Sequence, residues 1–444
     1  MPERVFIPFD LPVYRGLNSN HPLLACLVEQ QYDGISLQRA KPSAFTGSAR
    51  VMESAAELSS EVSTVLDSRV ADPDAQRDIA AFVCSRDLVS QTQVPADVDL
   101  AFYHTAPLHI NQTNWFLHIE SISQIFYPFL SQGKLPPQPL QHLPVFWCIR
   151  ALLESDRCKA IFSNLEFTVD QLATVFRSEI INAKTSHIAA GPWFTPVQEE
   201  IVQSGLAERQ QRDEVKILFT NSWHDDPLNF ILRGGIELVV AFLAIAPECP
   251  NLTLVMRTSV PEMFRGTELE QTMRTHPRIT LISDRMSDDQ MVQLFADADI
   301  FALYAAALHS VSLLRAMHCA SACIVSDAPG YSEYIDDGVH GLVLSGRREQ
   351  INRMDEGSGW VMDDYSGLFA APVDEQRITK MASSLRRLYD SAALRRSLGA
   401  EARRRALTSN SFTVWRSGFE RIMRSSLEKS VISSSAEMYD PVVR

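Results

Sequence analysis

The chain has 444 residues, a length that favours two domains at roughly 100–200 residues per domain. Hydrophobic residues make up 45% and charged residues 21%, which is typical of a globular protein and excludes disordered, fibrous and low-complexity classes. The formal charge of -13 argues against nucleic-acid binding, which needs a strongly positive surface, so we expect no nucleic acid among the partners.

The sequence also bears on the cellular compartment. Its 7 cysteines show no paired framework, and the closest two, Cys319 and Cys323, are expected to be buried apolar residues rather than metal ligands. It has neither a signal-peptide pattern at its start nor an apolar run of about 18 residues. We therefore expect a cytoplasmic protein. An arginine-rich segment, 395–405, is expected to be a solvated helix face, with peripheral contact to the inner face of the membrane as the alternative.

The first half opens like an α/β sheet. A predicted strand at 5–9 is followed by a loop rich in Pro, Gly and Asn and by an apolar helical segment at 22–30. Residues 48–90 are predicted to be helical. Three more apolar strands are predicted at 100–103, 115–119 and 160–163, with polar residues where they end. Strand ends are where α/β sheets place their ligands.

The second half is more regular. A polar linker is predicted at 204–214, after which strands and helices alternate. The predicted strands are 215–220, 252–256, 279–282, 300–304 and 323–326, and the helices between them are 234–246, 288–296 and 311–319. This alternation predicts parallel βαβ units in a doubly wound sheet. We expect an N-terminal domain at 1–208, a C-terminal domain at 209–429 with helices from 377 to 427, and a disordered tail at 430–444.

Several segments of the second half match a known family in order and spacing. They are Ile-Leu-Phe-Thr at 217–220, Arg-Gly-Gly at 233–235, Asp-Ala-Asp-Ile-Phe-Ala-Leu at 297–303, Leu-Leu-Arg-Ala-Met-His at 313–318, Ala-Pro-Gly-Tyr-Ser-Glu-Tyr-Ile-Asp-Asp-Gly-Val-His-Gly at 328–341, and two terminal segments at 394–403 and 411–415. Residues 215–425 thereby resemble the nucleotide-sugar-binding half of family 4 glycosyltransferases. The resemblance implies the GT-B fold, in which two Rossmann-like doubly wound domains face each other across a cleft. Residues 1–210 resemble the family in fewer features.

The sequence departs from this family at two places. The family carries two glutamates separated by seven residues, and these positions hold Ala307 and Arg315 here. A Gly-Arg pair that follows the first strand of the domain is replaced by Asn221 and Ser222, with extra residues at 223–232. The resemblance implies a retaining, metal-independent reaction, but the lost glutamates leave retaining or inverting stereochemistry open.

The resemblance implies a donor site that stabilises the leaving nucleoside diphosphate with cations and helix N-termini. Arg233 precedes a helix start, and Arg257 is expected either to replace the missing cation or to be solvated. Ser310 is a predicted N-cap, while Glu333 is expected to accept N–H bonds within the turn at 328–341. The full set of expected donor-binding residues is Gly16, Asn221, Ser222, Arg233, Gly234, Arg257, His309, Ser310, Arg315 and Glu333.

Arg315 allows two interpretations. It indicates a donor with extra negative charge or an altered nucleotide, or else an inactive site with the arginine on the surface. In the first half, His118 and Glu120 alternate at a strand end, so they share a face and are candidate catalytic bases for an acceptor hydroxyl. A metal site built from His104, His109 and His118 is not expected, and no cofactor is predicted apart from the donor substrate.

These observations predict a hexosyltransferase-like glycosyltransferase. It would transfer a sugar from a nucleotide sugar to a hydroxyl of a glycan or a lipid-linked acceptor, in cell-surface polysaccharide or glycoconjugate synthesis. The alternative is a catalytically inactive GT-B module that acts as a scaffold or nucleotide-binding partner in a glycosylation complex.

Overall fold

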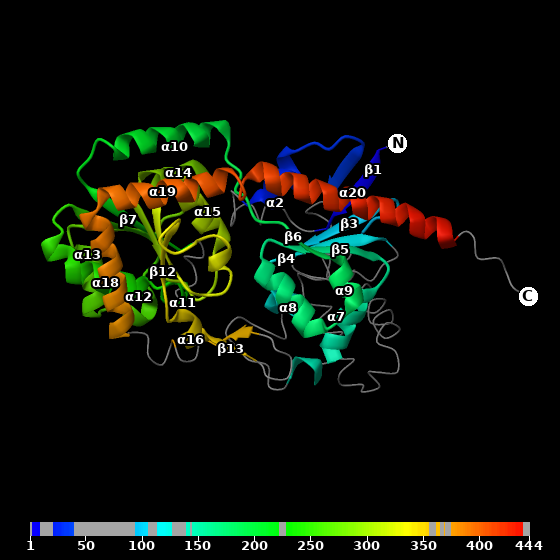
Figure 1. Ribbon diagram of the computed structural model, residues 1–444, viewed down its shortest axis with the longest axis horizontal. Coiled ribbons are helices and arrows are strands. Elements are labelled where there is room, and N and C mark those ends of the chain that lie inside the picture. The colour runs from blue at the N-terminus through cyan, green and yellow to red at the C-terminus, as the bar shows by residue number, and fades with distance from the viewer. Residues whose placement is uncertain are drawn as a thin grey trace, which may run out of the picture.

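Two parallel sheets of six strands each organise the molecule (Figure 1). The computed structural model describes residues 2–8, 21–39, 94–104, 113–126, 139–142, 144–221, 228–354, 361–364, 368 and 374–437. The helices predicted at 48–90, and Gly16, Ser222 and His109, lie outside these residues. We call the unit around the first sheet, residues 2–190 with 412–437, the N-terminal lobe, and the unit formed by residues 195–411 the C-terminal lobe.

The sheet of the N-terminal lobe has the order β2-β1-β3-β4-β5-β6. Its strands are β1 (Glu3–Ile7), β2 (Ile35–Arg39), β3 (Leu100–His104), β4 (Trp115–Ile119), β5 (Cys158–Ser163) and β6 (Thr185–His187). Strands β3, β4 and β5 are buried along their whole length, as their continuous apolar runs require in a parallel sheet covered on both faces. The parallel register of β3 and β4 sets His104 beside His118 at the carboxyl edge.

Short helices connect these strands. They are α2 (Pro22–Leu24) with the π-helical turn η1 (Ala25–Glu29), α6 (Ile122–Ile125), η4 (Leu140–His142), α7 (Pro144–Glu154), α8 (Glu166–Phe176) and α9 (Glu179–Lys184). The helical segment predicted at 22–30 thus begins at the expected residue.

Helix α10 (Pro196–Arg209) corrects the linker predicted at 204–214. Its start is a capping box of Thr195 and Gln198, and it runs through the segment that looked like a polar connection. Figure 1 shows α10 lying over helix α14 (Asp288–Asp297) of the C-terminal lobe. A Cβ on Gly205 would lie 2.7 Å from the Cβ of Ala296, so the helices pack closely at this point. The buried residues of α10 are Gln198, Val202 and Gly205, so its sequence carries little of the apolar periodicity that indicates a helix.

The sheet of the C-terminal lobe has the order β12-β11-β10-β7-β8-β9. Its strands are β7 (Val215–Thr220), β8 (Leu252–Arg257), β9 (Ile279–Ile282), β10 (Ile300–Leu303), β11 (Ala322–Ser326) and β12 (Gly341–Leu344). Its helices are α11 (Leu228–Leu232), α12 (Gly235–Ile245), η5 (Ala246–Glu248), η6 (Glu262–Phe264), α13 (Glu268–Thr275), α14, α15 (Ser310–His318), η7 (Tyr331–Glu333), α16 (Arg347–Ile351), α18 (Glu375–Asp390) and α19 (Ala392–Leu407). A small antiparallel pair, β13 (Asn352–Met354) with β14 (Val361–Asp363), follows α16.

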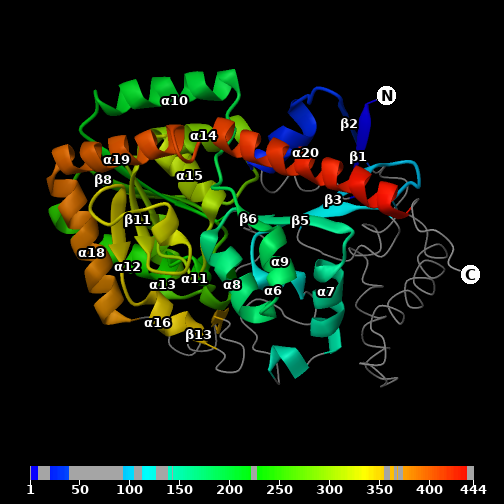
Figure 2. The same ribbon diagram turned by 45° about the vertical axis from the view of Figure 1, so that its right-hand side comes forward.

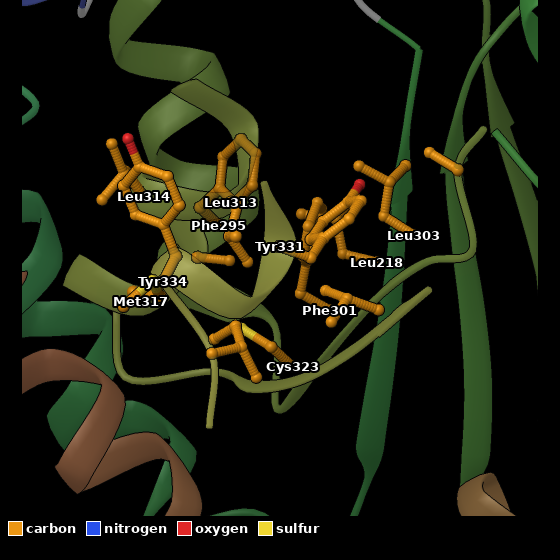
Figure 3. Close-up of a cluster of buried hydrophobic side chains, with 14 of the residues drawn as sticks. Leu218, Phe295, Phe301, Leu303, Leu313, Leu314, Met317, Cys323, Tyr331 and Tyr334 are labelled. Carbon is orange, nitrogen blue, oxygen red and sulfur yellow. The ribbon is translucent and has the colours of Figure 1, made fainter. Parts of the chain in front are cut away.

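The turn at 328–341 is anchored in the core of this lobe. Figure 3 shows Tyr331 and Tyr334 among side chains of β10, β11 and α15, and both tyrosines are 1% exposed. Their burial fixes the position of Glu333, which lies between them in the sequence.

The last helix, α20 (Phe412–Glu437), belongs to the N-terminal lobe. It leaves α19 and runs across the first sheet (Figures 1 and 2). The ring of Phe419 lies 5.5 Å from that of Phe102 and 6.0 Å from those of Phe116 and Phe162, measured between centroids. The aromatic face of this helix is therefore buried on the N-terminal lobe, although the domain predicted at 209–429 includes residues 412–429. The helix extends to Glu437, into the tail predicted at 430–444. No described helix is long and apolar enough to span a membrane.

Within the residues that the structure describes, the chain crosses between the lobes twice, and the two crossings touch. One is at Gly191 and the other at Ser411, and a Cβ on Gly191 would collide with the backbone of Ser411. The Asn410 side chain also donates to the carbonyl of Ala190 over 3.3 Å. Only glycine fits at residue 191.

A second set of contacts holds the lobes together beside α8. The N-cap of this helix is Leu165, which has no polar side chain, and the Glu333 carboxylate takes its place. Its oxygens accept the backbone N–H groups of Glu166 over 2.7 Å and Phe167 over 2.9 Å. The C-terminal lobe thus supplies the N-terminal cap of a helix in the other lobe.

The cap predicts how the lobes respond to a substitution at Glu333. Because Glu333→Ala leaves two N–H groups of α8 without their carboxylate, we expect it to cost about 0.5–2 kcal/mol of stability. We also expect faster hydrogen exchange of the Glu166 and Phe167 amides and a larger radius of gyration by small-angle X-ray scattering.

The matched control is Asp374→Ala. Asp374 accepts the N–H groups of Gln376 and Arg377 at the start of α18, within one lobe. This variant should lose stability similarly without changing the radius of gyration. Unchanged exchange at Glu166 and Phe167 in Glu333→Ala would contradict the interpretation.

The C-terminal lobe also contains a buried ion pair. Arg347 and Glu237 are 0% and 1% exposed, with 2.8 Å between Nη2 and Oε1. Burial raises the pKa of the Glu237 carboxyl although Arg347 opposes the shift. The guanidinium also donates to the carbonyl of Tyr304 and lies 4.3 Å from that ring's centroid. This pair ties α12 to α16 across the end of β10.

Removing one partner should therefore be costly. Glu237→Ala leaves a desolvated guanidinium, and we expect a loss of about 3–5 kcal/mol in chemical denaturation. The double variant Glu237→Leu with Arg347→Met should recover most of that loss. Asp390→Ala, which breaks an exposed pair with Arg386, serves as control and should change little. A small effect of Glu237→Ala would show that the pair is not a structural requirement.

Candidate functional site

Three histidines and a glutamate gather at the carboxyl edge of the first sheet. His104 ends β3, His118 lies near the end of β4, and Glu120 follows β4 directly. His21, at the N-cap of α2, completes the group, with its ring centroid 6.1 Å from that of His118 and 6.3 Å from that of His104. His118 and Glu120 are the two candidate bases expected from the sequence, whereas His21 was not expected here.

His104 and His118 form a closely stacked pair. Their rings are nearly parallel with centroids 4.9 Å apart, and their Nδ1 atoms are 2.8 Å apart, so one Nδ1–H donates to the other ring. Burial lowers the pKa of His104 to about 4, and burial followed by the charge of His104 lowers that of His118. Both rings are neutral at neutral pH. Because His118 is 0% exposed, it is out of reach of a substrate in this arrangement.

Glu120 is the more accessible of the two candidate bases. Its side chain is 37% exposed, and Oε1 lies 3.2 Å from Nε2 of His21. Gln124 donates to Oε2 over 3.4 Å, and the Thr168 hydroxyl donates to the backbone carbonyl over 2.8 Å. Burial raises the pKa of Glu120, but the contact with His21 and the charges that the neighbouring imidazoles carry when protonated outweigh it and lower the pKa well below its usual range. The carboxylate is therefore ionised at neutral pH.

Arg233 links two helix starts in the C-terminal lobe. It is 1% exposed, donates to the carbonyl of Thr220 over 3.1 Å and has Nη2 3.0 Å from Nδ1 of His309. Gly234 follows it with φ of 78°, and a Cβ there would lie 2.6 Å from the carbonyl oxygen of Tyr304. Arg233, Gly234 and His309, all predicted donor-site residues, thus meet where α12 and α15 begin.

The charge of Glu120 acts on His309 of the other lobe. Burial and then Arg233 lower the pKa of His309, and the charge of Glu120 opposes this shift. The two groups are therefore within electrostatic range of each other.

Helix α15 starts one residue before its predicted position. His309 is the N-cap and forms no side-chain cap hydrogen bond, while Ser310 is the first helical residue. The expected capping role of the Ser310 hydroxyl is therefore wrong. Ser310 still lies at the helix start, where the backbone N–H groups favour an anion.

Arg257 and Asn221 lie at the carboxyl ends of the neighbouring strands β8 and β7. Arg257 is 8% exposed, and its guanidinium donates to the carbonyl of Asn221 over 2.7 Å. The Asn221 side chain in turn donates to the Thr258 hydroxyl over 3.4 Å. A solvated Arg257, one of the two expectations, is excluded because the side chain is folded against the end of β7.

Arg315 is buried rather than on the surface. It is 8% exposed, and its Cζ lies 6.0 Å from the centroid of the Phe295 ring on α14. Burial lowers its pKa to about 10, against the opposing charge of Asp288, and Arg257 adds to the lowering. Arg257 also contributes to the lowered pKa of Arg233, which is about 10 and is caused mainly by burial. Three arginines therefore concentrate positive charge in this part of the lobe.

Glu333 has a different role from the one expected within its own turn. Its carboxylate is bound to the start of α8, and its backbone carbonyl accepts a hydrogen bond from Arg405 over 2.8 Å. The reason is geometric: the buried tyrosines on either side of Glu333 turn its side chain toward the other lobe. It joins the lobes beside the site instead of extending into the donor region.

The arginine-rich segment on α19 is also partly engaged inside the protein. Arg403 donates to the carbonyl of His318, and Arg395 donates to that of Tyr389 over 2.8 Å. The prediction of a wholly solvated helix face is wrong for these two residues. In the described part of the chain, no group of three or more His, Cys, Asp and Glu residues is arranged to hold a metal ion.

Comparison with known proteins identifies a family segment and the fold. Residues 235–353 match the family model of glycosyl transferases group 1, and no curated protein sequence matches the chain. An α,α-trehalose-phosphate synthase (UDP-forming) from Burkholderia vietnamiensis has 12% identity and a TM-score of 0.55, over 95% of this chain and 100% of its own. Sucrose-phosphate synthase from Thermosynechococcus elongatus has 14% identity and a TM-score of 0.52, over 96% and 98%.

A third similar structure is Anabaena HepE in complex with UDP and glucose. It has 12% identity and a TM-score of 0.50, over 96% of this chain and 100% of its own. At such identities these structures establish the fold alone. The chain has the two-domain GT-B fold, and within its C-terminal lobe it carries a segment that matches the glycosyl transferases group 1, as the sequence resemblance implied.

Proposed function

We propose that this protein is a glycosyltransferase that moves a sugar from a nucleotide sugar to a hydroxyl group of an acceptor. The observation that carries the proposal is the contact of Arg233 with His309 at the starts of α12 and α15, within electrostatic range of Glu120 of the other lobe. A cation and helix N-termini on one side, and a proton acceptor on the other, are what such a transfer needs.

The donor side is suited to the leaving group. Cleavage of a glycosyl phosphate bond builds negative charge on the nucleoside diphosphate, and preorganised donors lower the barrier most where that charge develops. Arg233 is held by Thr220, and Arg257 by Asn221, so neither guanidinium needs to reorganise when the charge appears. The N–H groups at the start of α15 add to this field.

The acceptor side is suited to a hydroxyl group. A carboxylate accepts hydrogen bonds only, so Glu120 can hold a hydroxyl proton on its exposed side. Its lowered pKa makes it a weak base. We therefore expect it to orient the hydroxyl first and to take the proton as the glycosyl bond breaks.

The buried Arg315 supports a donor with additional negative charge. It brings a third guanidinium to a region that already holds Arg233 and Arg257, and a uronic acid on the nucleotide sugar would complement this charge. The UDP and glucose bound by HepE make UDP-glucose the natural first probe and UDP-glucuronate its charged counterpart.

For the acceptor we propose a glycan or a lipid-linked glycan in cell-surface polysaccharide or glycoconjugate synthesis in the cytoplasm, with the retaining stereochemistry that the family resemblance implies. The hydrogen bonds of Arg395 and Arg403 inside the protein speak against α19 as the surface for peripheral membrane contact.

A second candidate is the inactive GT-B module. It is favoured by Ala307, which has no carboxylate, and by Arg315, which places a cation where the family carries a glutamate. Such a module would bind a nucleoside diphosphate and turn over no donor.

A panel of UDP-glucose, UDP-glucuronate, UDP-N-acetylglucosamine and GDP-mannose tests both candidates. We expect at least one donor to release its nucleoside diphosphate, and Arg233→Gln to lower kcat/KM for that donor about 100-fold, since a buried cation near the developing charge is lost. Arg233→Lys, which keeps the charge, should lose less. The anomeric proton of the product, followed by NMR, reports stereochemistry.

The matched control is Arg278→Gln. Arg278 also donates to two backbone carbonyls, those of Ala246 and Cys249, but on the side of the sheet away from the site, so turnover should stay within about 3-fold of the unsubstituted protein. Binding of UDP by calorimetry without turnover of any donor would favour the inactive module. Neither binding nor turnover would refute the proposed function.

A further inference from the structure

His21 has a fixed proton position. Its ring is 1% exposed, and Nδ1 accepts the backbone N–H of Leu23 over 3.1 Å at the start of α2. An imidazole nitrogen that accepts a hydrogen bond carries no proton, so the proton of the neutral ring is on Nε2. The N-cap of α2 thereby selects the tautomer.

That Nε2 is the atom that lies 3.2 Å from Oε1 of Glu120. The other oxygen, Oε2, also lies near a donor that is oriented by a helix cap. The side-chain oxygen of Gln124 accepts the N–H of Ser121 in the capping box of α6, which turns its amide nitrogen toward Oε2. Each oxygen of Glu120 therefore lies within 3.4 Å of a nitrogen whose orientation is set by a helix cap, and the contact of His21 lacks full hydrogen-bond geometry.

These contacts restrict the terminal torsion of Glu120, which sets the plane of its carboxylate. The terminal torsion of a glutamate is broad and roughly two-fold, so packing alone does not hold the plane of the carboxylate. Contacts from two different elements, α2 and α6, restrict it.

We propose that His21 is a positioning residue for Glu120. The cap of α2 fixes the tautomer of the imidazole, and this tautomer fixes the plane of the Glu120 carboxylate. This inference deepens the proposed function and rests on it, because the carboxylate needs orienting only if it receives a substrate hydroxyl.

The other groups around Glu120 do not replace His21. The titratable and charged residues that face it from β3, β4 and the start of α15 are His104, His118, and His309 with Arg233 behind it. His104 and His118 are engaged with each other through their Nδ1 atoms, and His309 is engaged with Arg233. His21 is the imidazole that contacts the carboxylate within the described residues.

Two substitutions separate the role of His21 as the cap of α2 from its contact with Glu120. His21→Asn keeps an acceptor near the position of Nδ1 for the Leu23 N–H and has no atom at the position of Nε2. His21→Gln places an amide nitrogen near the position of Nε2. The matched control is His276→Asn, because His276 Nδ1 accepts the N–H of Arg278 over 3.2 Å in the same local pattern, far from the site.

With UDP-glucose as the probe, we expect His21→Asn to lower kcat about 10- to 100-fold with KM changed less than about 3-fold, as for a misplaced reacting group. His21→Gln should restore most of the loss. Both asparagine variants should unfold at nearly the same temperature as the unsubstituted protein, because each keeps its cap. A His21→Asn enzyme with the kcat of His276→Asn would overturn the proposal.

A second measurement does not depend on turnover. In protein labelled with nitrogen-15 at histidine, the resonances missing from His21→Asn identify His21. We expect the neutral ring to carry its proton on Nε2, and Glu120→Gln to shift that nitrogen's resonance. A proton on Nδ1, or a resonance that Glu120→Gln leaves unchanged, would overturn the link between the two side chains.

The two measurements distinguish the two proposals. If no donor on the panel is turned over but His21 shows the Nε2 proton and responds to Glu120→Gln, the proposed function fails and the link stands. If donors are turned over and His21 does not respond, the link fails and the proposed function stands.

Discussion

The arrangement of the site depends on the contacts that the C-terminal lobe makes with residues 164–167. Asn164 is 4% exposed, and its backbone carbonyl accepts the hydroxyl of Tyr334 from the C-terminal lobe over 3.0 Å. Its side-chain oxygen accepts the indole N–H of Trp415 on α20 over 2.7 Å, within the N-terminal lobe. Glu333, beside Tyr334, caps α8 at the next residues. Buried polar groups must be satisfied, so the bonds of Tyr334 and Glu333 hold one relative position of the lobes.

The fold of the C-terminal lobe could be read from the sequence because its parallel strands are buried on both faces. Such strands appear as short apolar runs separated by amphipathic helices, and the elements predicted between 215 and 326 have ends within one residue of the structure. The one-residue shift at the start of α15 still changed a role, since it made His309 the cap instead of Ser310. An apolar pattern predicts that a helix or strand exists more reliably than it predicts the residue at which the element begins or ends.

What could not be predicted are contacts between residues far apart in the chain. The pattern of α20 shows that Trp415 and Phe419 are buried, but not that the N-terminal sheet covers them. Glu333 lies 167 residues from the Glu166 N–H that it accepts, so its own turn seemed the natural partner. His21 was missed for the same reason: the signal was a polar residue directly before a helix, and its partner Glu120 is on a different strand connection. The periodicity of a helix or strand shows which of its faces is buried, but not which element packs against that face.

The position of α20 has a consequence for synthesis. The aromatic core of the first sheet, with Phe102, Phe116 and Phe162, receives Phe419 from the last helix of the chain. On the ribosome, the first sheet therefore emerges long before the residue that completes its core, whereas the second sheet has all of its strands by Leu344. Domains usually mature in the order in which they are translated. In this protein the lobe made first is the lobe finished last.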